Sequence, residues 1–124
     1  MNKEEMKQRT KRFALDIIRL VRSLPRSPLA DTMGRQLLRA GTSVGANYRA
    51  ACRAKSTADF IAKMGTVEEE IDESAYWLEL LTESGVLGEE AVQSLIRTNF
   101  LLLWSLPSRL LVNAGEISAD IFAH

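Results

Sequence analysis

Hydrophobic residues recur with the period of an α-helix in four segments of the chain, and three short breaks separate these segments. No segment alternates apolar and polar residues over the length that a half-buried strand requires. The first segment predicts a helix over residues 3–24, in which Phe13, Ile17, Leu20 and Leu24 form one apolar stripe. Pro25 then ends the helix.

The second predicted helix begins with Ser27 as its N-cap and Pro28 at its first position. Its apolar stripe consists of Met33, Leu37, Val44, Tyr48 and Ala51. Small residues are dense in the same segment, and Gly41 and Gly45 lie well inside it. Each interior glycine costs roughly 1 kcal/mol relative to alanine. We therefore expect this helix to lie at a crowded contact, either within the subunit or between subunits.

The third predicted helix begins at Ser56, where Asp59 stands in the position of a capping-box acid, and ends at Gly85 as the C′ residue. Its apolar positions are Phe60, Met64, Val67, Ile71, Ala75, Leu78 and Leu81. The fourth helix starts after Gly88 and runs through a leucine-rich segment. Pro107 falls inside that segment and is expected to kink or divide the helix.

Short connections between four helices favour antiparallel neighbours. The predicted fold class is therefore all-α, an antiparallel up-down-up-down four-helix bundle that forms a single domain over residues 1–124. One cysteine, Cys52, permits no intramolecular disulfide, which fits a reducing cytoplasm. The N-terminal residues are charged rather than apolar, and the longest apolar run, residues 100–107, is too short to cross a membrane. We expect a soluble cytoplasmic protein.

Charge changes the picture, because a net charge of zero conceals a strong asymmetry. Residues 1–55 hold 13 of the 16 lysines and arginines and four of the 16 acids, so their net charge is +9. Residues 56–124 hold the other three basic residues and the other 12 acids, so their net charge is −9. Such a division indicates either a surface for a partner or self-complementarity between copies.

The acidic half contains a dense run of carboxylates in the third helix. A bundle that holds a pair of metal ions uses Glu-x-x-His motifs, but none occurs here and the only histidine is His124. We therefore expect no metal, no cofactor, no catalytic constellation and no small-molecule substrate. The alternative is an acidic face directed at solvent or at a neighbouring subunit, with Glu68, Glu69, Asp72 and Glu73 as its members.

The basic half offers candidates for contact with nucleic acid or with another subunit: Arg35, Arg39, Arg49, Arg53 and Lys55. Basic stripes bind phosphate backbones electrostatically, without reading the sequence. The pI of 6.6 lies well below that of typical nucleic-acid-binding domains. Ser43 and Asn47 lie one helical turn apart and form a candidate polar pair that sets helix register.

Two segments carry a resemblance to a known family. Residues 36–47 read QLLRAGTSVGAN, followed by YRAACRAKS and then Asp59 and Phe60, and residues 67–81 read VEEEIDESAYWLELL. The chain thereby resembles the four-helix-bundle proteins related to those encoded in 23S rRNA intervening sequences. The resemblance implies a small cytoplasmic bacterial protein that forms a ring, commonly a homopentamer. Relatives include the accessory protein of diversity-generating retroelements, a basic pentamer that binds nucleic acid and a reverse transcriptase.

Two functional hypotheses follow. The first is a non-enzymatic, ring-forming interaction or scaffold protein, since a ring needs two different faces that fit each other. The second is an RNA- or DNA-binding protein that uses the basic face of its first two helices.

Overall fold

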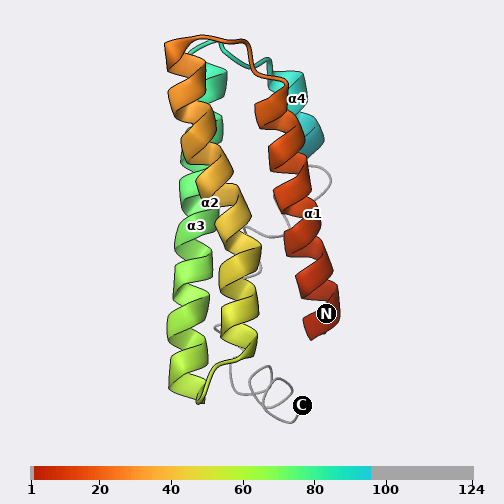
Figure 1. The fold of residues 1–124 in the computed structure, drawn as a ribbon, viewed down its shortest axis with the longest axis vertical. Coiled ribbons are helices and arrows are strands. Elements are labelled where there is room, and N and C mark those ends of the chain that lie inside the picture. The colour runs from red at the N-terminus through yellow and green to blue at the C-terminus, as the bar shows by residue number, and fades with distance from the viewer. Residues whose placement is uncertain (1, 96–124) are drawn as a thin grey trace.

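The structure is a computed structural model that describes residues 2–95 and contains four helices in this range. The helices are α1 (Lys3–Arg22), α2 (Pro28–Cys52), α3 (Thr57–Glu83) and α4 (Glu89–Leu95). Consecutive helices run in opposite directions (Figure 1). No strand occurs within residues 2–95, so the predicted all-α class is confirmed. The predicted kink at Pro107 and the later part of the fourth helix lie outside the described residues.

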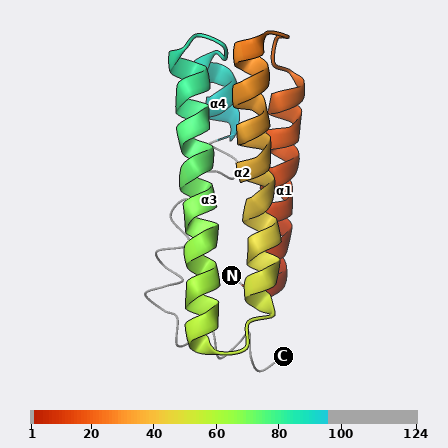
Figure 2. The ribbon, with the colours of Figure 1, turned by 60° about the vertical axis from the view of Figure 1, so that its left-hand side comes forward.

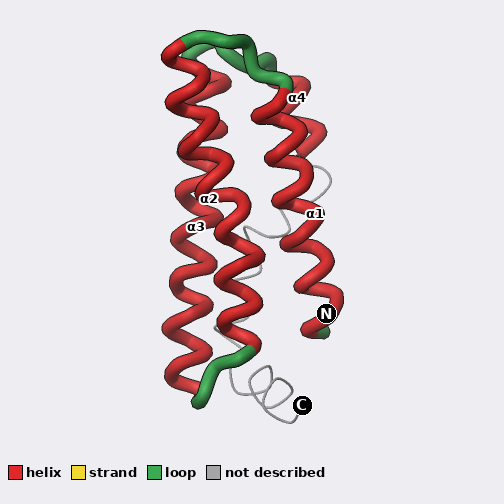
Figure 3. The backbone as a smooth tube through the Cα atoms, in the orientation of Figure 1, coloured by secondary structure: helices red, strands yellow, loops and turns green. Residues whose placement is uncertain are grey.

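The helix α2 has two neighbours, since it packs against α1 on one side and against α3 on the other. Figure 2 shows α2 and α3 side by side along their whole lengths, with α4 beside the upper end of α3. The α1–α2 and α3–α4 connections lie at one end of the bundle and the α2–α3 connection lies at the other (Figure 3). This arrangement leaves one side of α1 and one side of α3 facing outward.

Side-chain caps define where α2 and α3 begin, as the sequence predicts. The Ser27 hydroxyl accepts the N–H of Ala30 at 3.1 Å, and the Ser56 hydroxyl accepts the N–H of Asp59 at 3.1 Å. The Asp59 carboxylate reaches back to the N–H of Lys55, at 3.0 Å, one residue before the position that a regular capping box uses. Each cap satisfies backbone donors that have no partner inside the helix.

The helix α1 ends at Arg22, two residues before the predicted end at Leu24. The N–H of Ser23 bonds to the carbonyl oxygens of Arg19 and Leu20, at 3.2 Å and 3.1 Å, and closes the last turn. Because Pro25 disfavours helical geometry at the residue before it, Leu24 lies outside the helix. The end of α3 agrees with the prediction, since Gly85 follows it with a φ of 83°.

The predicted apolar stripes form the core. All five apolar positions of the second helix and all seven of the third are buried, and Phe13, Ile17 and Leu20 of α1 join them. Buried helix faces of this kind, rather than intrinsic propensity, supply most of the stability of a bundle. Within residues 2–95 no helix combines the length and the apolar character that crossing a membrane requires.

Three glycines of α2 face α1 and allow the two helices to approach closely. A methyl group added at Gly41 would stand 2.8 Å from Cγ1 of Ile17, and one at Gly34 would stand 2.9 Å from Cδ1 of Leu24. At Gly45 the nearest atom is Oγ1 of Thr10, at 3.2 Å. We call Gly34, Gly41 and Gly45 the glycine seam. The crowded contact that the sequence predicts for the second helix therefore lies within the subunit, against α1.

Candidate functional site

An arginine of α2 meets two glutamates of α3 across the line where these helices pack. The Nη1 atom of Arg39 lies 3.5 Å from Oε2 of Glu70, and its Nη2 atom contacts Oε1 of Glu73. The indole nitrogen of Trp77 lies 3.5 Å from the same Glu73 oxygen. The ring of Tyr76 packs edge-on against Trp77, with 5.3 Å between ring centroids and 66° between the planes.

The pKa values of the two glutamates in this cluster are shifted in opposite directions. The hydrogen bond from Arg39 lowers the pKa of Glu73, and the Trp77 indole adds to this effect. Burial raises the pKa of Glu70, and Arg39 opposes that rise only in part. The bond to Glu73 in turn raises the pKa of Arg39. Arg39 therefore stabilises the ionised form of Glu73 most strongly.

The predicted acidic face divides between this cluster and the outside of the bundle. Glu73 is bonded to Arg39 of its own chain, whereas Glu69 and Asp72 are exposed and Glu68 is half-buried. None of these last three carboxylates forms an ion pair with another residue in the range 2–95. Glu79 and Glu83 extend the exposed acidic surface along α3.

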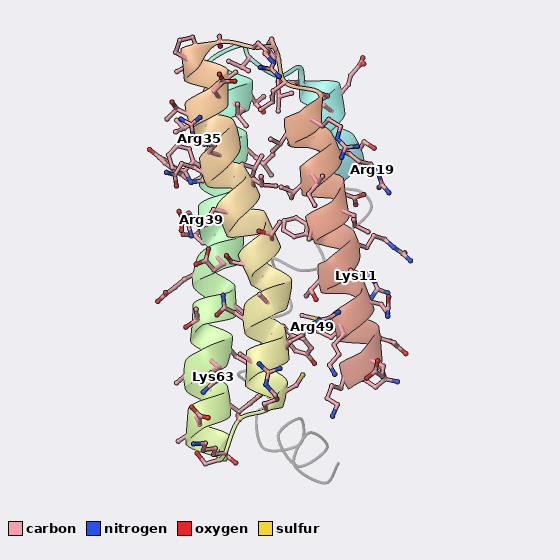
Figure 4. All side chains as sticks on the ribbon, in the orientation of Figure 1. Lys11, Arg19, Arg35, Arg39, Arg49 and Lys63 are labelled. Atoms are coloured by element: carbon pink, nitrogen blue, oxygen red, sulfur yellow. The ribbon has the colours of Figure 1, made fainter. Side chains whose placement is uncertain are left out.

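The predicted basic residues divide in the same way. Arg39 is engaged with α3, whereas the other four side chains are exposed and form no ion pair within the described part of the chain: Arg35, Arg49, Arg53 and Lys55. Their spacing in α2 places Arg35 and Arg49 on one side of the helix, and Arg53 is the C-cap residue that follows it. Figure 4 shows the labelled basic side chains of α1 and α2 distributed over the surface of the bundle.

The helix α1 adds further cations to the basic face that the second hypothesis places on the first two helices. Lys11, Arg12 and Arg22 are exposed and have no ion pair with any residue of the range 2–95. Lys11 and Arg19 project from the side of α1 that is turned away from α3 (Figure 4). Arg19 forms an ion pair with Asp16, at 2.9 Å, on the same helix. The outward side of α1 is therefore a second basic surface beside that of α2.

The candidate polar pair of α2 bonds within its own helix. The Asn47 side-chain amide donates to the backbone carbonyl of Ser43 at 2.8 Å, and the Ser43 hydroxyl donates to the carbonyl of Arg39 at 2.6 Å. The next residue, Tyr48, is buried, and the half-buried Cys52 lies beside it one turn further along α2. Burial, with a smaller effect of Cys52, raises the pKa of the Tyr48 phenol.

A shallow hollow of about 410 Å³ lies between α1 and α4. Its lining residues are Asp16, Arg19, Leu20, Ala91, Ser94 and Leu95. The polar groups of this lining are the carboxylate of Asp16, the guanidinium of Arg19 and the hydroxyl of Ser94. Across residues 2–95 no three side chains of the metal-binding types gather in one place.

Fold and surface together define a small helical bundle whose candidate sites are charged outer faces. The chain belongs to the family described as 23S rRNA-intervening sequence protein, whose model matches residues 2–101. This match confirms the resemblance seen in residues 36–60 and 67–81.

A solved crystal structure is similar over most of its length. It is a protein with unknown function from the S23 ribosomal protein family of Bacteroides thetaiotaomicron, with 34% sequence identity and a TM-score of 0.78. The alignment covers 86% of the present chain and 97% of the other chain. A comparison with curated proteins gives no match.

Proposed function

We propose that the protein is a non-enzymatic, ring-forming interaction or scaffold module of the cytoplasm, with the homopentamer as its expected form. The observation that carries this proposal is the placement of its charges. The outward side of α1 presents unpaired cations, and the outward side of α3 presents unpaired carboxylates.

Two different faces on one chain favour a head-to-tail contact. In a two-fold symmetric contact made by only one of these faces, that face meets its own copy, so like charges would oppose each other. In a head-to-tail contact, the basic face of one copy meets the acidic face of the next, and repeated contacts of this kind close a ring when the rotation permits. Complementary charge also disfavours wrong registers.

Light scattering of the purified, nuclease-treated chain tests the proposal. At micromolar concentration in moderate salt, the expected particle has about five times the chain mass of 13.8 kDa. Higher salt weakens contacts between exposed charges, so the assembly should lose stability as ionic strength rises. A monomer of 13.8 kDa at every concentration would overturn the ring.

A second function, binding of RNA or DNA, is supported by a specific observation. The side chains of Arg35, Arg49, Arg53 and Lys55 are exposed and form no ion pair in the range 2–95, so they are free to contact phosphate. Arg39 differs, because Glu70 and Glu73 occupy its guanidinium.

Binding to structured RNA across a salt series tests this second function. Affinity that depends on phosphate contacts falls steeply as the salt concentration rises. The slope of log affinity against log salt concentration is close in magnitude to the number of contacts. Arg49→Ala together with Arg53→Ala should lower that slope by about 2. Arg35→Ala should lower it by about 1, and Arg39→Ala should leave it unchanged. Binding that does not respond to salt would rule out phosphate contact.

A further inference from the structure

Two exposed apolar side chains stand on helix faces of opposite charge. Leu15 of α1 is 42% exposed and Tyr76 of α3 is 53% exposed. Residues three and four positions away along a helix are surface neighbours. Around Leu15 these neighbours include Lys11, Arg12 and Arg19, and around Tyr76 they include Asp72, Glu73 and Glu79.

The aromatic ring of Tyr76 contacts its neighbour in the chain, Trp77. It packs edge-on against Trp77, whose indole nitrogen lies within hydrogen-bond distance of Glu73. Glu73 is in turn bound by Arg39 of α2. A tyrosine side chain has only two rotatable torsions, so it loses little conformational freedom when it binds, which suits it to anchor an interface.

We propose that Tyr76 is the anchor of the contact between copies, and that the α1 face around Leu15 of the next copy receives it. This inference rests on the proposed ring and specifies which surfaces meet. The phenol ring and the leucine side chain would exclude water at the centre, and charges of opposite sign would surround them. A contact between two α3 faces would place carboxylates against carboxylates, and a contact between two α1 faces would place cations against cations. Both pairings are disfavoured.

The other two large apolar side chains that are exposed within residues 2–95 lack such surroundings. Leu29 and Ile61 are exposed, but neither is surrounded at helical spacing by charges of one sign. Leu29 belongs to the first turn of α2 and therefore provides a control that is matched to Tyr76 in exposure.

The first measurement compares the wild-type chain with Tyr76→Ala and Leu29→Ala by sedimentation velocity at a series of concentrations. Tyr76→Ala should weaken association at least tenfold, as the loss of a central anchor does. Leu29→Ala should leave association within about twofold of wild type. Circular dichroism of both variants establishes that the helices are intact.

The second measurement reverses charge on each face. One variant carries Asp72→Lys and Glu79→Lys, another carries Lys11→Glu and Arg12→Glu, and a third carries all four changes. These side chains are exposed and form no ion pair within residues 2–95, so the fold should tolerate their reversal. Each single-face variant should fail to assemble alone. The variant that carries all four changes (the four-fold variant) should assemble again. An equimolar mixture of the two single-face variants should also associate.

The outcomes separate this inference from the proposed function. A monomeric wild-type chain would overturn the ring itself and, with it, the assignment of its faces. A wild-type assembly that tolerates Tyr76→Ala and both reversals would leave the ring standing and overturn the assignment. Loss of assembly in both single-face variants, without recovery in the four-fold variant or in the mixture, would overturn the pairing of these two faces.

Discussion

Arg39 and Glu73 lie 34 positions apart in the chain, and their side chains join α2 to α3 within one subunit. The contact pairs Arg39, one of the predicted basic residues, with Glu73, one of the predicted acidic residues. The remaining members of both sets are exposed, apart from Glu68, which is half-buried. The division of charge along the sequence therefore produces both a contact inside the bundle and charged surfaces on its outside.

The glutamates beside Arg39 should titrate in a defined order. We expect NMR titration to give Glu73 a pKa below its ordinary value and Glu70 a pKa above it, since Arg39 bonds most strongly to Glu73 and burial dominates at Glu70. In Arg39→Ala both pKa values should rise, because each loses a favourable cation. An unchanged pKa of Glu73 in that variant would contradict the observed pairing.

The same contact predicts a pH-dependent contribution to stability. A lowered folded-state pKa means that Glu73 contributes stability above its unfolded pKa, and that this contribution is lost as the pH falls through the folded-state value. The stability difference between wild type and Arg39→Ala should therefore be largest near neutral pH and should shrink in acid. Urea denaturation at several pH values measures it. Arg35→Ala, which removes an exposed and unpaired cation, should show no such trend.

Two glycine substitutions should change stability in opposite directions. Gly41→Ala places a methyl group 2.8 Å from the buried Ile17 and should destabilise the chain by about 1–3 kcal/mol. Gly65→Ala meets no atom within 4 Å and should stabilise α3 by about 0.5–1 kcal/mol. Chemical denaturation at one fixed protein concentration compares them, because assembly makes apparent stability depend on concentration. Equal effects of the two changes would contradict the close approach of α1.

A matched pair of leucines separates the core from the surface. Leu37 is 0% exposed in the middle of α2, whereas Leu29 at the start of the same helix is 56% exposed. Leu37→Ala should cost about 2–5 kcal/mol of unfolding free energy, since a cavity remains. Leu29→Ala should stay within about 0.5 kcal/mol of wild type. Thermal and chemical denaturation should rank the two variants in the same order.

The N-terminal cap of α3 should contribute measurably. Ser56→Ala removes the acceptor of the Asp59 N–H and should lower the unfolding free energy by about 1 kcal/mol. Ser56→Asp keeps an acceptor at this position and should recover most of the loss. A Ser56→Ala variant as stable as wild type would show that the cap bond contributes nothing.

Much of the fold is predictable from the sequence because its signals are local. Helical spacing identifies the buried positions of α2 and α3, and Ser27, Ser56 and Gly85 mark where helices begin or end. The end of α1 is less predictable, because Leu24 continues the apolar stripe while Pro25 removes it from the helix.

The candidate site is less predictable, because its contacts join residues far apart in the chain. The bonds from Arg39 to Glu70 and Glu73 depend on the axial register of α2 against α3, which neither helix encodes alone. Likewise, the small residues of α2 indicate a close neighbour without identifying it as α1. The register pair Ser43–Asn47 and the subunit faces stay predictions.

The glycine seam has a consequence for the thermodynamics of assembly. A one-turn slip of α1, about 5.4 Å, would replace Ile17 opposite Gly41 by a side chain of different shape. The close packing of α1 against the glycine seam therefore holds the backbones that carry the cations of α1 and α2 in one relative position. Binding then requires no reordering of the two helices. The free energy of association is then reduced by the ordering of exposed lysine and arginine side chains, but not by the ordering of the helices that carry them.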